Sequence, residues 1–192
     1  MTTFRTFIAL DFPCPVLDKI KKIQKSIDSS YSSIIRWTKP ENIHLTLKFL
    51  GEVKIEKIQT IEKSLDSIAN KMEPFKIDLS EIGAFPNWGH PRIIWIGLEK
   101  SEPLLLLAKE IEENMNEIGF EREIRPFSPH LTIGRVRDDT SFKDFQMMEN
   151  KCRTFTRIED RIPINNIYIY KSDLQPFGPI YSLLHSSPFK LA

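Results

Sequence analysis

The tetrapeptide His-Leu-Thr-Leu/Ile occurs twice in this chain, once in each half. The first copy begins at His44 and the second at His130, which is 130 − 44 = 86 residues later in a sequence of 192 residues. Each copy follows a loop that contains proline and opens a stretch typical of a β-strand. A segment with helical spacing precedes each of these strands. The repeat predicts two lobes that face each other with approximate two-fold symmetry.

Successive side chains of a β-strand point to opposite faces. His44 and Thr46 therefore share one face of their strand, and His130 and Thr132 share one face of theirs. The leucine and isoleucine residues of both motifs face the other way and are expected to pack into a helix-covered core. If the two lobes face each other, both His-Thr pairs line one central cleft.

The spacing of the apolar residues predicts the other elements. We expect strands at residues 3–11, 34–37, 44–50, 75–82, 93–98, 130–136, 162–170 and 180–185, and helices at residues 16–30, 55–72 and 102–118, with a short helix after residue 144. Strand pairs alternate with helices, which favours an α+β fold. We predict a single bilobal domain over residues 1–192, with two mainly antiparallel sheets, outer helices and pseudo-two-fold symmetry around a central cleft.

The composition excludes several classes of protein. A formal net charge of +1 excludes a strongly basic nucleic-acid coat but permits a local basic site. The two cysteines, Cys14 and Cys152, form no Cys-x-x-Cys pair, which suits a reducing compartment and argues against a cysteine-ligated zinc site. No apolar stretch has the length of a signal peptide or a membrane span, so a cytoplasmic protein with no membrane partner is expected.

Sequence motifs for metal and ATP chemistry are absent as well. The sequence has no His-Glu-x-x-His motif, no glycine-rich phosphate loop and no Lys-x-Asp-Gly segment of the kind that nucleotidyl-transferring ligases use. We therefore expect no metal ion and no other cofactor, and we do not expect ATP-dependent ligation.

Two imidazoles across a cleft form a general acid-base pair. Histidine titrates near neutral pH, so one ring can accept a proton while the other donates one. The hydroxyl groups of Thr46 and Thr132 can donate hydrogen bonds to a phosphoryl group between the rings. This set suits in-line displacement at phosphorus without a metal ion if the ester is strained, as a 2′,3′-cyclic phosphate is. A lone His-Leu-Thr is usually only part of a strand, and it is the duplication that favours the chemical interpretation.

Several basic residues lie near the two motifs. Arg135 lies five residues after His130, and this odd separation places it on the opposite face unless the strand bulges. Arg135 is either a phosphate clamp or a solvated edge residue. Lys48 shares the face of His44 by parity and would add positive potential to the cleft. The further arginines around the second motif are Arg122, Arg125 and Arg137.

Three aromatic residues and two further histidines each have two interpretations. Phe85 and Trp88, in a loop with proline and glycine, either stack on a base or cover the core. Tyr181 either packs or contacts a nucleotide, and we include it among the candidate substrate-binding residues. His90 and His185 lack the His-x-Thr pattern and are expected to be structural or surface residues.

Five segments of the chain together resemble a known family. They are RTFIALDFP, WTKPENIHLTLKFLGEV, IGAFPNWGHPRIIWIGL, FSPHLTIGRV and YKSDLQPFGPIYSLL. The family is the 2H phosphoesterases, named for two His-x-Thr-x motifs. The chain looks most like their bacterial and archaeal RNA 2′,3′-cyclic phosphodiesterases, historically called 2′-5′ RNA ligases. The resemblance implies the bilobal fold inferred above and, as the partner, an RNA or oligonucleotide with a 2′,3′-cyclic phosphate end.

The resemblance also implies roles for single residues. His44 is expected to be the proton donor and His130 the proton acceptor that activates water, although the residues themselves do not rank two nearly identical motifs. Thr46 and Thr132 are expected to hold the phosphoryl oxygens, and Arg135 matches an arginine of the family's motif. The 3′ oxygen is expected to leave beside His44 and yield a 2′-phosphate. The reverse reaction, with an RNA 5′-hydroxyl in place of water, would be a weak 2′-5′ ligation.

Two alternatives stay open from the sequence. A phosphodiesterase of the same fold could act on another small cyclic or 2′-5′-linked nucleotide, and a substrate panel would distinguish it. A non-catalytic RNA-end binder could use the cleft for recognition alone, and a turnover assay would distinguish it. In each case we expect a monomer.

Overall fold

The computed structural model of the chain describes residues 2–31, 34–138, 140–155, 158–176 and 178–190. Its strands are β1 (Thr3–Leu10), β2 (Ile35–Trp37), β3 (Leu45–Lys54), β4 (Phe75–Phe85), β5 (Ile93–Leu98), β6 (His130–Val136), β7 (Ile158–Ile164), β8 (Asn166–Gln175) and β9 (Gly178–Pro188). Its helices are α1 (Cys14–Tyr31), the 3-10 helix η1 (Pro40–Asn42), α2 (Ile55–Ala69), α3 (Glu102–Glu117) and α4 (Phe142–Cys152).

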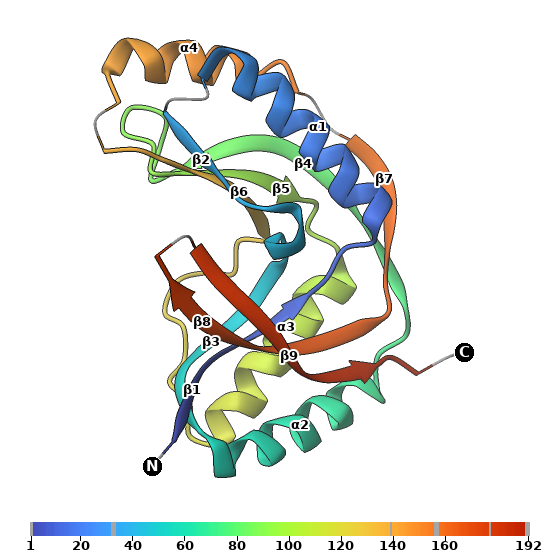
Figure 1. Cartoon of the computed structure of the whole chain (residues 1–192). Coiled ribbons are helices and arrows are strands. Elements are labelled where there is room, and N and C mark those ends of the chain that lie inside the picture. The colour runs from blue at the N-terminus through green and yellow to red at the C-terminus, as the bar shows by residue number, and fades with distance from the viewer. Residues whose placement is uncertain (1, 32–33, 139, 156–157, 177, 191–192) are drawn as a thin grey trace.

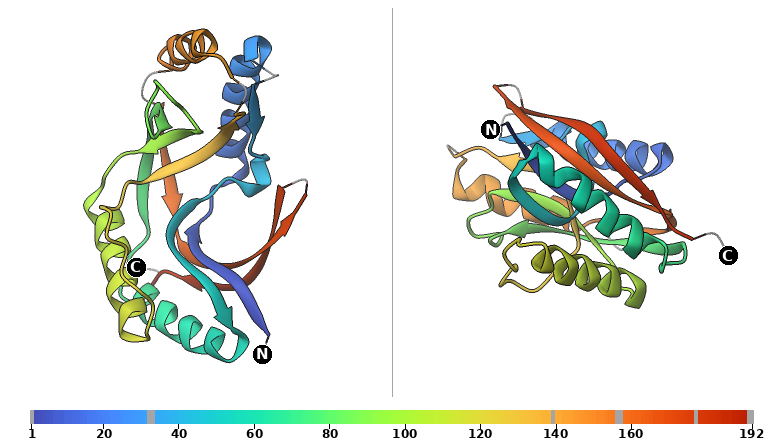
Figure 2. Two further views of the ribbon diagram at one scale, coloured as in Figure 1. Left: turned by 90° about the vertical axis from the view of Figure 1, so that its left-hand side faces the viewer. Right: turned by 90° about the horizontal axis from the view of Figure 1, so that it is seen from below.

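The strands form one curled sheet. Their order is β7-β4-β5-β6-β3-β1-β8-β9, with β2 paired to β6, and the neighbours run antiparallel. Figure 1 shows α1 and α4 together at one end of the molecule and α2 and α3 at the other, and Figure 2 shows the curl of the strands from two further sides. The predicted antiparallel α+β fold is confirmed, and the two predicted sheets are the two halves of this one sheet.

Each half of the sheet is covered by a helix that follows a strand of the other half. We call β7, β4, β5, β6 and β2 the β6 half, and β3, β1, β8 and β9 the β3 half. Helix α1 follows β1 of the β3 half but packs against β2, whereas α3 follows β5 of the β6 half but packs against β3. This exchange of helices ties the two halves together.

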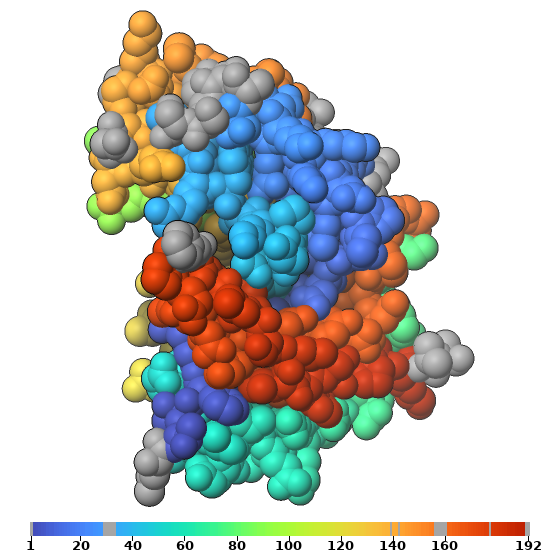
Figure 3. Space-filling model, in the orientation of Figure 1, coloured from blue at the N-terminus to red at the C-terminus, as the bar shows by residue number. Residues whose placement is uncertain are grey.

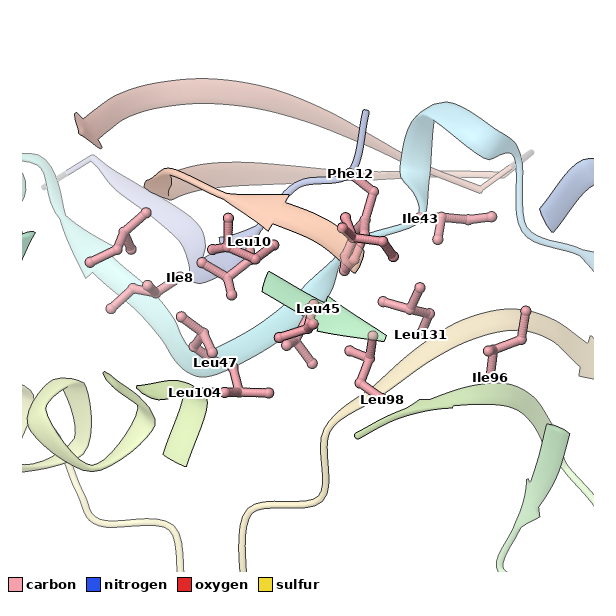
Figure 4. Packing of buried hydrophobic residues seen from close by; sticks show 14 of the residues in the cluster. Ile8, Leu10, Phe12, Ile43, Leu45, Leu47, Ile96, Leu98, Leu104 and Leu131 are labelled. Atoms are coloured by element: carbon pink, nitrogen blue, oxygen red, sulfur yellow. The ribbon is translucent and has the colours of Figure 1, made fainter. Parts of the chain in front are cut away.

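The two halves meet where β3 passes β6. Leu45 of β3 pairs with Leu131 of β6, and the two side chains are 1% and 0% exposed. Figure 4 shows both of them among other buried aliphatic side chains, including Leu47 and Leu98. Burying one such leucine contributes about 1.5–3 kcal/mol, so hydrophobic contact rather than a long hydrogen-bonded ladder holds this seam.

Helix α3 illustrates how the sequence specifies its elements. The side chain of Ser101 accepts a hydrogen bond from the backbone N–H of Leu104, and a proline lies in the first turn. Its buried residues recur at helical spacing: Leu104, Leu107, Ala108, Ile111 and Met115. None of the helices in the described ranges is both long and apolar enough to cross a membrane.

Several predicted strands have different bounds in the structure: β3 ends at Lys54, four residues beyond the predicted end at residue 50, and β9 spans Gly178–Pro188 in place of residues 180–185. The predicted strand at residues 162–170 is divided between β7 and β8 at Asn165. The buried positions are even-numbered up to Ile164 and odd-numbered from Ile167 onward. Apolar residues occur on both sides of Asn165, so the sequence reads as one strand. Strand β4 extends to Phe85, three residues beyond the predicted end at residue 82.

The predicted position of Lys48 in the cleft is wrong. Ile8 of β1 pairs with Lys48, but the next residue, Ala9, pairs with Thr46, so Leu47 is an extra residue in β3. Beyond such a bulge, each side chain points to the face opposite to the one that simple alternation predicts. Lys48 is only 6% exposed, and its Nζ donates to Glu112 Oε1 at 2.7 Å and to the carbonyl oxygen of Glu121 at 2.8 Å. It therefore anchors α3 and the segment after it, outside the cleft.

Replacing this buried lysine should destabilise the protein. We expect Lys48→Met to lower the free energy of unfolding by about 2–4 kcal/mol. Two hydrogen bonds to a charged group, each worth about 1.5–3 kcal/mol, are lost, and the removal of a buried charge offsets part of that loss. Urea denaturation measures the loss.

The control is Lys109→Met on α3, the helix that Lys48 anchors. Lys109 lies 3.8 Å from Glu113 in an exposed pair, and its loss should cost less than about 0.5 kcal/mol. Equal losses for the two variants would contradict a structural role for Lys48.

Candidate active site

The four residues of the two His-x-Thr motifs lie on one face of the sheet. Leu45 pairs with Leu131 in an antiparallel register, and extending it by one residue on each side sets His44 opposite Thr132 and Thr46 opposite His130, since 44 + 132 and 46 + 130 both equal 45 + 131. The leucines point into the core, so the imidazoles and hydroxyls point to the other face. All four polar side chains are partly exposed there.

His44 is held by the backbone just before it and by two aromatic rings. Its Nδ1 lies 2.9 Å from the carbonyl oxygen of Asn42, the last residue of η1. Phe7 of β1 stacks on the imidazole with ring centroids 4.7 Å apart, and Tyr181 of β9 meets it edge-on at 5.2 Å. The side chain of Asn42 donates to the carbonyl oxygen of Pro179 at 3.0 Å, which connects η1 to β9, the strand that carries Tyr181.

His130 has equivalent surroundings in the other half. Its Nδ1 lies 2.7 Å from the carbonyl oxygen of Ser128, which again is two residues before the histidine. Phe85 meets the ring edge-on at 4.9 Å, and Trp95 lies 6.3 Å away. Both pairs of aromatic rings hold their imidazole at the cleft.

The carbonyl contacts determine the chemistry that each ring offers. A carbonyl oxygen only accepts hydrogen bonds, so Nδ1 of His44 and of His130 must carry a proton. Nε2 of each ring is then a proton acceptor in the neutral form and a proton donor in the charged form. Nε2 is therefore the ring nitrogen that this contact leaves unengaged in both histidines.

Burial affects the protonation of His44. Desolvation lowers the pKa of His44 to about 4, against a smaller opposing effect of the bond to the Asn42 carbonyl. His44 is therefore neutral at pH 7 in the free protein. A nearby anion would favour the imidazolium and raise this pKa.

A bulge brings Arg135 to the face of the histidines. Trp95 of β5 pairs with Thr132, whereas Ile93 pairs with Arg135, so β6 contains one extra residue between these pairs. Because Ile93 and Trp95 share a face, their partners share one too. The odd separation from His130 thus does not exclude Arg135, which is exposed beside the site.

Tyr181 lies within the electrostatic field of two arginines. Burial raises the pKa of Tyr181, while the positive charges of Arg135 and Arg5 lower it in part. Arg5 lies two residues before Phe7 on β1 and so shares its face. The site therefore combines two imidazoles, two threonine hydroxyls, one tyrosine hydroxyl and two guanidinium groups.

Sequence reasoning missed Arg5, Phe7 and Trp95. Alternation along β1 and β5 would have placed Arg5 on the same face as Phe7, and Trp95 on the same face as Ile93. Nothing in those segments indicated which face meets the histidines. Of the two aromatics expected in a loop, Phe85 is the last residue of β4 and contacts His130, whereas Trp88 packs against the hydrophobic core.

The other candidates lie elsewhere. Arg122 donates to Asn116 and Arg125 lies 3.9 Å from Glu123, in the exposed segment between α3 and β6, and Arg137 is exposed after β6. The expected structural or surface role of the remaining histidines is confirmed. His185 bonds to Asp66 of α2 at 2.7 Å, and His90 is exposed.

The site opens into a hollow of the surface. Figure 3 shows the surface hollowed where the chain around η1 meets the β8–β9 hairpin. A pocket of about 140 Å³ adjoins His44 and Tyr181. Among the described residues, no group of three or more His, Cys, Asp or Glu side chains is arranged to hold a metal ion.

Comparison with solved structures gives the same fold. A Thermus thermophilus protein matches with a TM-score of 0.80 and 24% identity, over 96% of this chain and 97% of that one. E. coli LigT complexed with 3′-AMP matches with a TM-score of 0.73 and 23% identity, over 97% of this chain and 98% of that one.

Comparison with sequences identifies the family. An Archaeoglobus fulgidus protein named RNA 2′,3′-cyclic phosphodiesterase is 36% identical over 92% of this chain and 96% of its own length. A Methanocaldococcus jannaschii protein of the same name is 36% identical over 94% of this chain and 98% of its own length. The family described as LigT like Phosphoesterase matches residues 10–95 and again 96–181, an offset of 96 − 10 = 86 residues that equals the spacing of the two histidines. The chain belongs to the LigT-like phosphoesterases, which confirms the resemblance inferred from its five segments.

Proposed function

We propose that this protein hydrolyses the 2′,3′-cyclic phosphate ends of RNA to 2′-phosphomonoesters by acid-base catalysis with two histidines and no metal ion. The observation that supports the proposal is the Leu45–Leu131 pairing, whose register gives two imidazoles and two hydroxyls a common face. The names of the relatives from A. fulgidus and M. jannaschii support the substrate class. Residues 1–192 act as one unit in this proposal, because both halves contribute to the site.

The proposed mechanism assigns a role to each group. His130 Nε2 accepts a proton from water as the water attacks phosphorus, and His44 Nε2 donates a proton to the leaving ribose oxygen on the opposite side. Thr46 and Thr132 donate hydrogen bonds to the phosphoryl oxygens. Their hydroxyls, already oriented by the strands, stabilise the charge that develops there.

Two further residues complete the proposed phosphate site. The guanidinium group of Arg135 offers charge-assisted hydrogen bonds to the phosphate, and the Tyr181 hydroxyl offers one more beside His44. The positive charge of Arg135 at the Tyr181 hydroxyl supports their shared position.

The acid role of His44 depends on the substrate. With a pKa of about 4, only a small fraction of His44 in the free protein carries, near neutral pH, the proton that it must donate. The cyclic phosphate carries one negative charge, and that charge beside the ring raises the pKa of His44. Substrate binding and the protonation of His44 are therefore coupled. The assignment of acid to His44 and base to His130 follows the family resemblance.

The reverse reaction is part of the proposal at a lower rate. An RNA 5′-hydroxyl in place of water would attack the cyclic phosphate and make a 2′-5′ linkage. Water competes at a far higher concentration, and nothing in the mechanism couples the reaction to ATP. A cytoplasmic location and a monomeric state stay predictions.

Removing either catalytic histidine should abolish most of the turnover. We expect His44→Ala and His130→Ala each to lower kcat for 2′,3′-cyclic AMP at least about a hundredfold, the usual contribution of a positioned acid or base. The assay contains a strong chelator, because the proposed mechanism uses no metal ion.

The matched control is His90→Ala, which removes an exposed loop histidine and should leave kcat unchanged. Circular dichroism verifies that each variant is folded. A folded His44 or His130 variant with near-normal kcat would refute the assignment, and loss of wild-type activity in the chelator would refute metal independence.

The pKa of His44 should rise when phosphate binds. In the free protein we expect the imidazole of His44 to titrate near pH 4 and to be neutral above it, and we expect inorganic phosphate to move this titration upward. Imidazole NMR signals, assigned by comparison with His44→Ala, report the shift. The profile of kcat/KM against pH should also be bell-shaped, with both limbs belonging to the histidine pair.

Two results would contradict this coupling. One is a His44 pKa that phosphate leaves unmoved, and the other is a rate that rises steadily to high pH, as expected for direct attack by hydroxide. His185→Asn, which changes a histidine away from the cleft, controls for general effects on the spectrum.

The direction of ring opening should follow the roles of the histidines. If the 3′ oxygen leaves beside His44, digestion of 2′,3′-cyclic AMP yields 2′-AMP. Chromatography against authentic 2′-AMP and 3′-AMP measures the ratio. Predominant 3′-AMP would reject both the regiochemistry and the acid role of His44.

A further inference from the structure

A second, larger pocket continues from the pocket beside His44. The pocket of about 140 Å³ is lined by His44 and Tyr181 and also by Asp11 and Tyr170. A pocket of about 360 Å³ shares Asp11 with it and extends to Tyr168. Together the two pockets fall in the size range that small-molecule ligands occupy. The mechanism proposed above uses none of the residues beyond Tyr181.

The floor of these pockets belongs to the same face as the histidine site. Phe7 of β1 pairs with Tyr170 of β8, and Ala9 pairs with Tyr168. Asp11 comes two residues after Ala9, directly beyond the end of β1. Phe7 stacks on both His44 and Tyr170, at 4.7 and 5.5 Å between ring centroids. A continuous aromatic surface thus leads from His44 to Asp11.

Asp11 has no cationic partner in the part of the chain that the structure describes. The hydroxyl of Tyr170 donates to its Oδ2, and among the described residues no lysine, arginine or histidine forms an ion pair with it. Burial raises the pKa of Asp11, and burial together with the charge of Asp11 raises the pKa of Tyr168. A partly buried carboxylate of this kind retains acceptor capacity for hydrogen-bond donors from a ligand.

We propose that these pockets hold the base of the nucleotide whose phosphate lies at the histidines, and that Asp11 makes the site prefer guanine. Guanine presents two adjacent donors, N1–H and the N2 amino group, which a carboxylate accepts in a two-point contact like that between a carboxylate and a guanidinium group. Adenine and cytosine each pair an amino donor with a ring acceptor, and uracil has one N–H between two carbonyls. Guanine is thus the base whose Watson–Crick edge fits an unpaired carboxylate.

The tyrosines supply the rest of the base site. The rings of Tyr168 and Tyr170 lie 6.2 Å apart with 31° between their planes, and Tyr181 adds a third ring beside His44. Bases stack on such rings without regard to sequence, whereas the carboxylate discriminates among them. The inference rests on the proposed function, because it places the cyclic phosphate between the histidines.

The test compares four cyclic mononucleotides. We expect wild-type kcat/KM to be at least about tenfold higher for 2′,3′-cyclic GMP than for the AMP, CMP and UMP analogues, the scale of one good two-point base contact. Asp11→Asn retains the shape of the side chain but sets an amide N–H against the guanine donors, so the ratio of GMP to AMP should fall to near one. Tyr170→Phe removes the hydroxyl bonded to Asp11 and leaves the carboxylate, so the ratio should persist.

The outcomes separate this inference from the proposed function. Similar kcat/KM for all four substrates in the wild type would overturn the role of Asp11 and leave the phosphodiesterase proposal standing, as would an unchanged ratio in folded Asp11→Asn. If no substrate is turned over, the proposed function fails, and calorimetry with 2′-GMP and 2′-AMP then tests the base preference by binding. Equal affinities would overturn it. Thermal unfolding verifies each variant, and the wild-type ratio decides alone if Asp11→Asn does not fold.

Discussion

The site depends on the passage of β3 alongside β6. Their antiparallel contact at Leu45 and Leu131 places each histidine opposite the threonine of the other motif. Because the chain directions are opposed, a repeat in sequence becomes a two-fold arrangement in space. The two leucines are almost completely buried, so separating the strands would expose the apolar centre of the molecule. The same hydrophobic contact that stabilises the fold thereby brings the polar groups of the site together.

The two histidines share a backbone contact and an aromatic setting. A carbonyl oxygen two residues earlier fixes the proton on Nδ1 in each case, so both rings offer Nε2 to a substrate. Burial among Phe7, Tyr181 and the neighbouring strands then lowers the pKa of His44. His44 therefore resists protonation in the free protein.

Two bulges determine which basic groups reach the cleft. The extra residue in β3 turns Lys48 away to Glu112, and the extra residue in β6 turns Arg135 toward the histidines. Without the extra residue in β3, Lys48 would share the face of His44. The positive potential at the cleft comes instead from Arg135 and Arg5, on strands that lie in different halves of the sheet.

The sequence by itself determined the α+β class, the two-fold repeat, the family and the shared face of each His-Thr pair, because these depend on composition, short motifs and the local alternation of a strand. Tertiary structure alone decided the sheet face to which Lys48 and Arg135 point and the break between β7 and β8. It also decided that Arg5, Phe7 and Trp95 lie at the site. Alternation predicts a facing only until an extra residue reverses it, and no local pattern marks that residue. Likewise, Phe7 and Trp95 meet the histidines across strand pairs, so their roles follow from the register between distant segments rather than from their own neighbours in the chain.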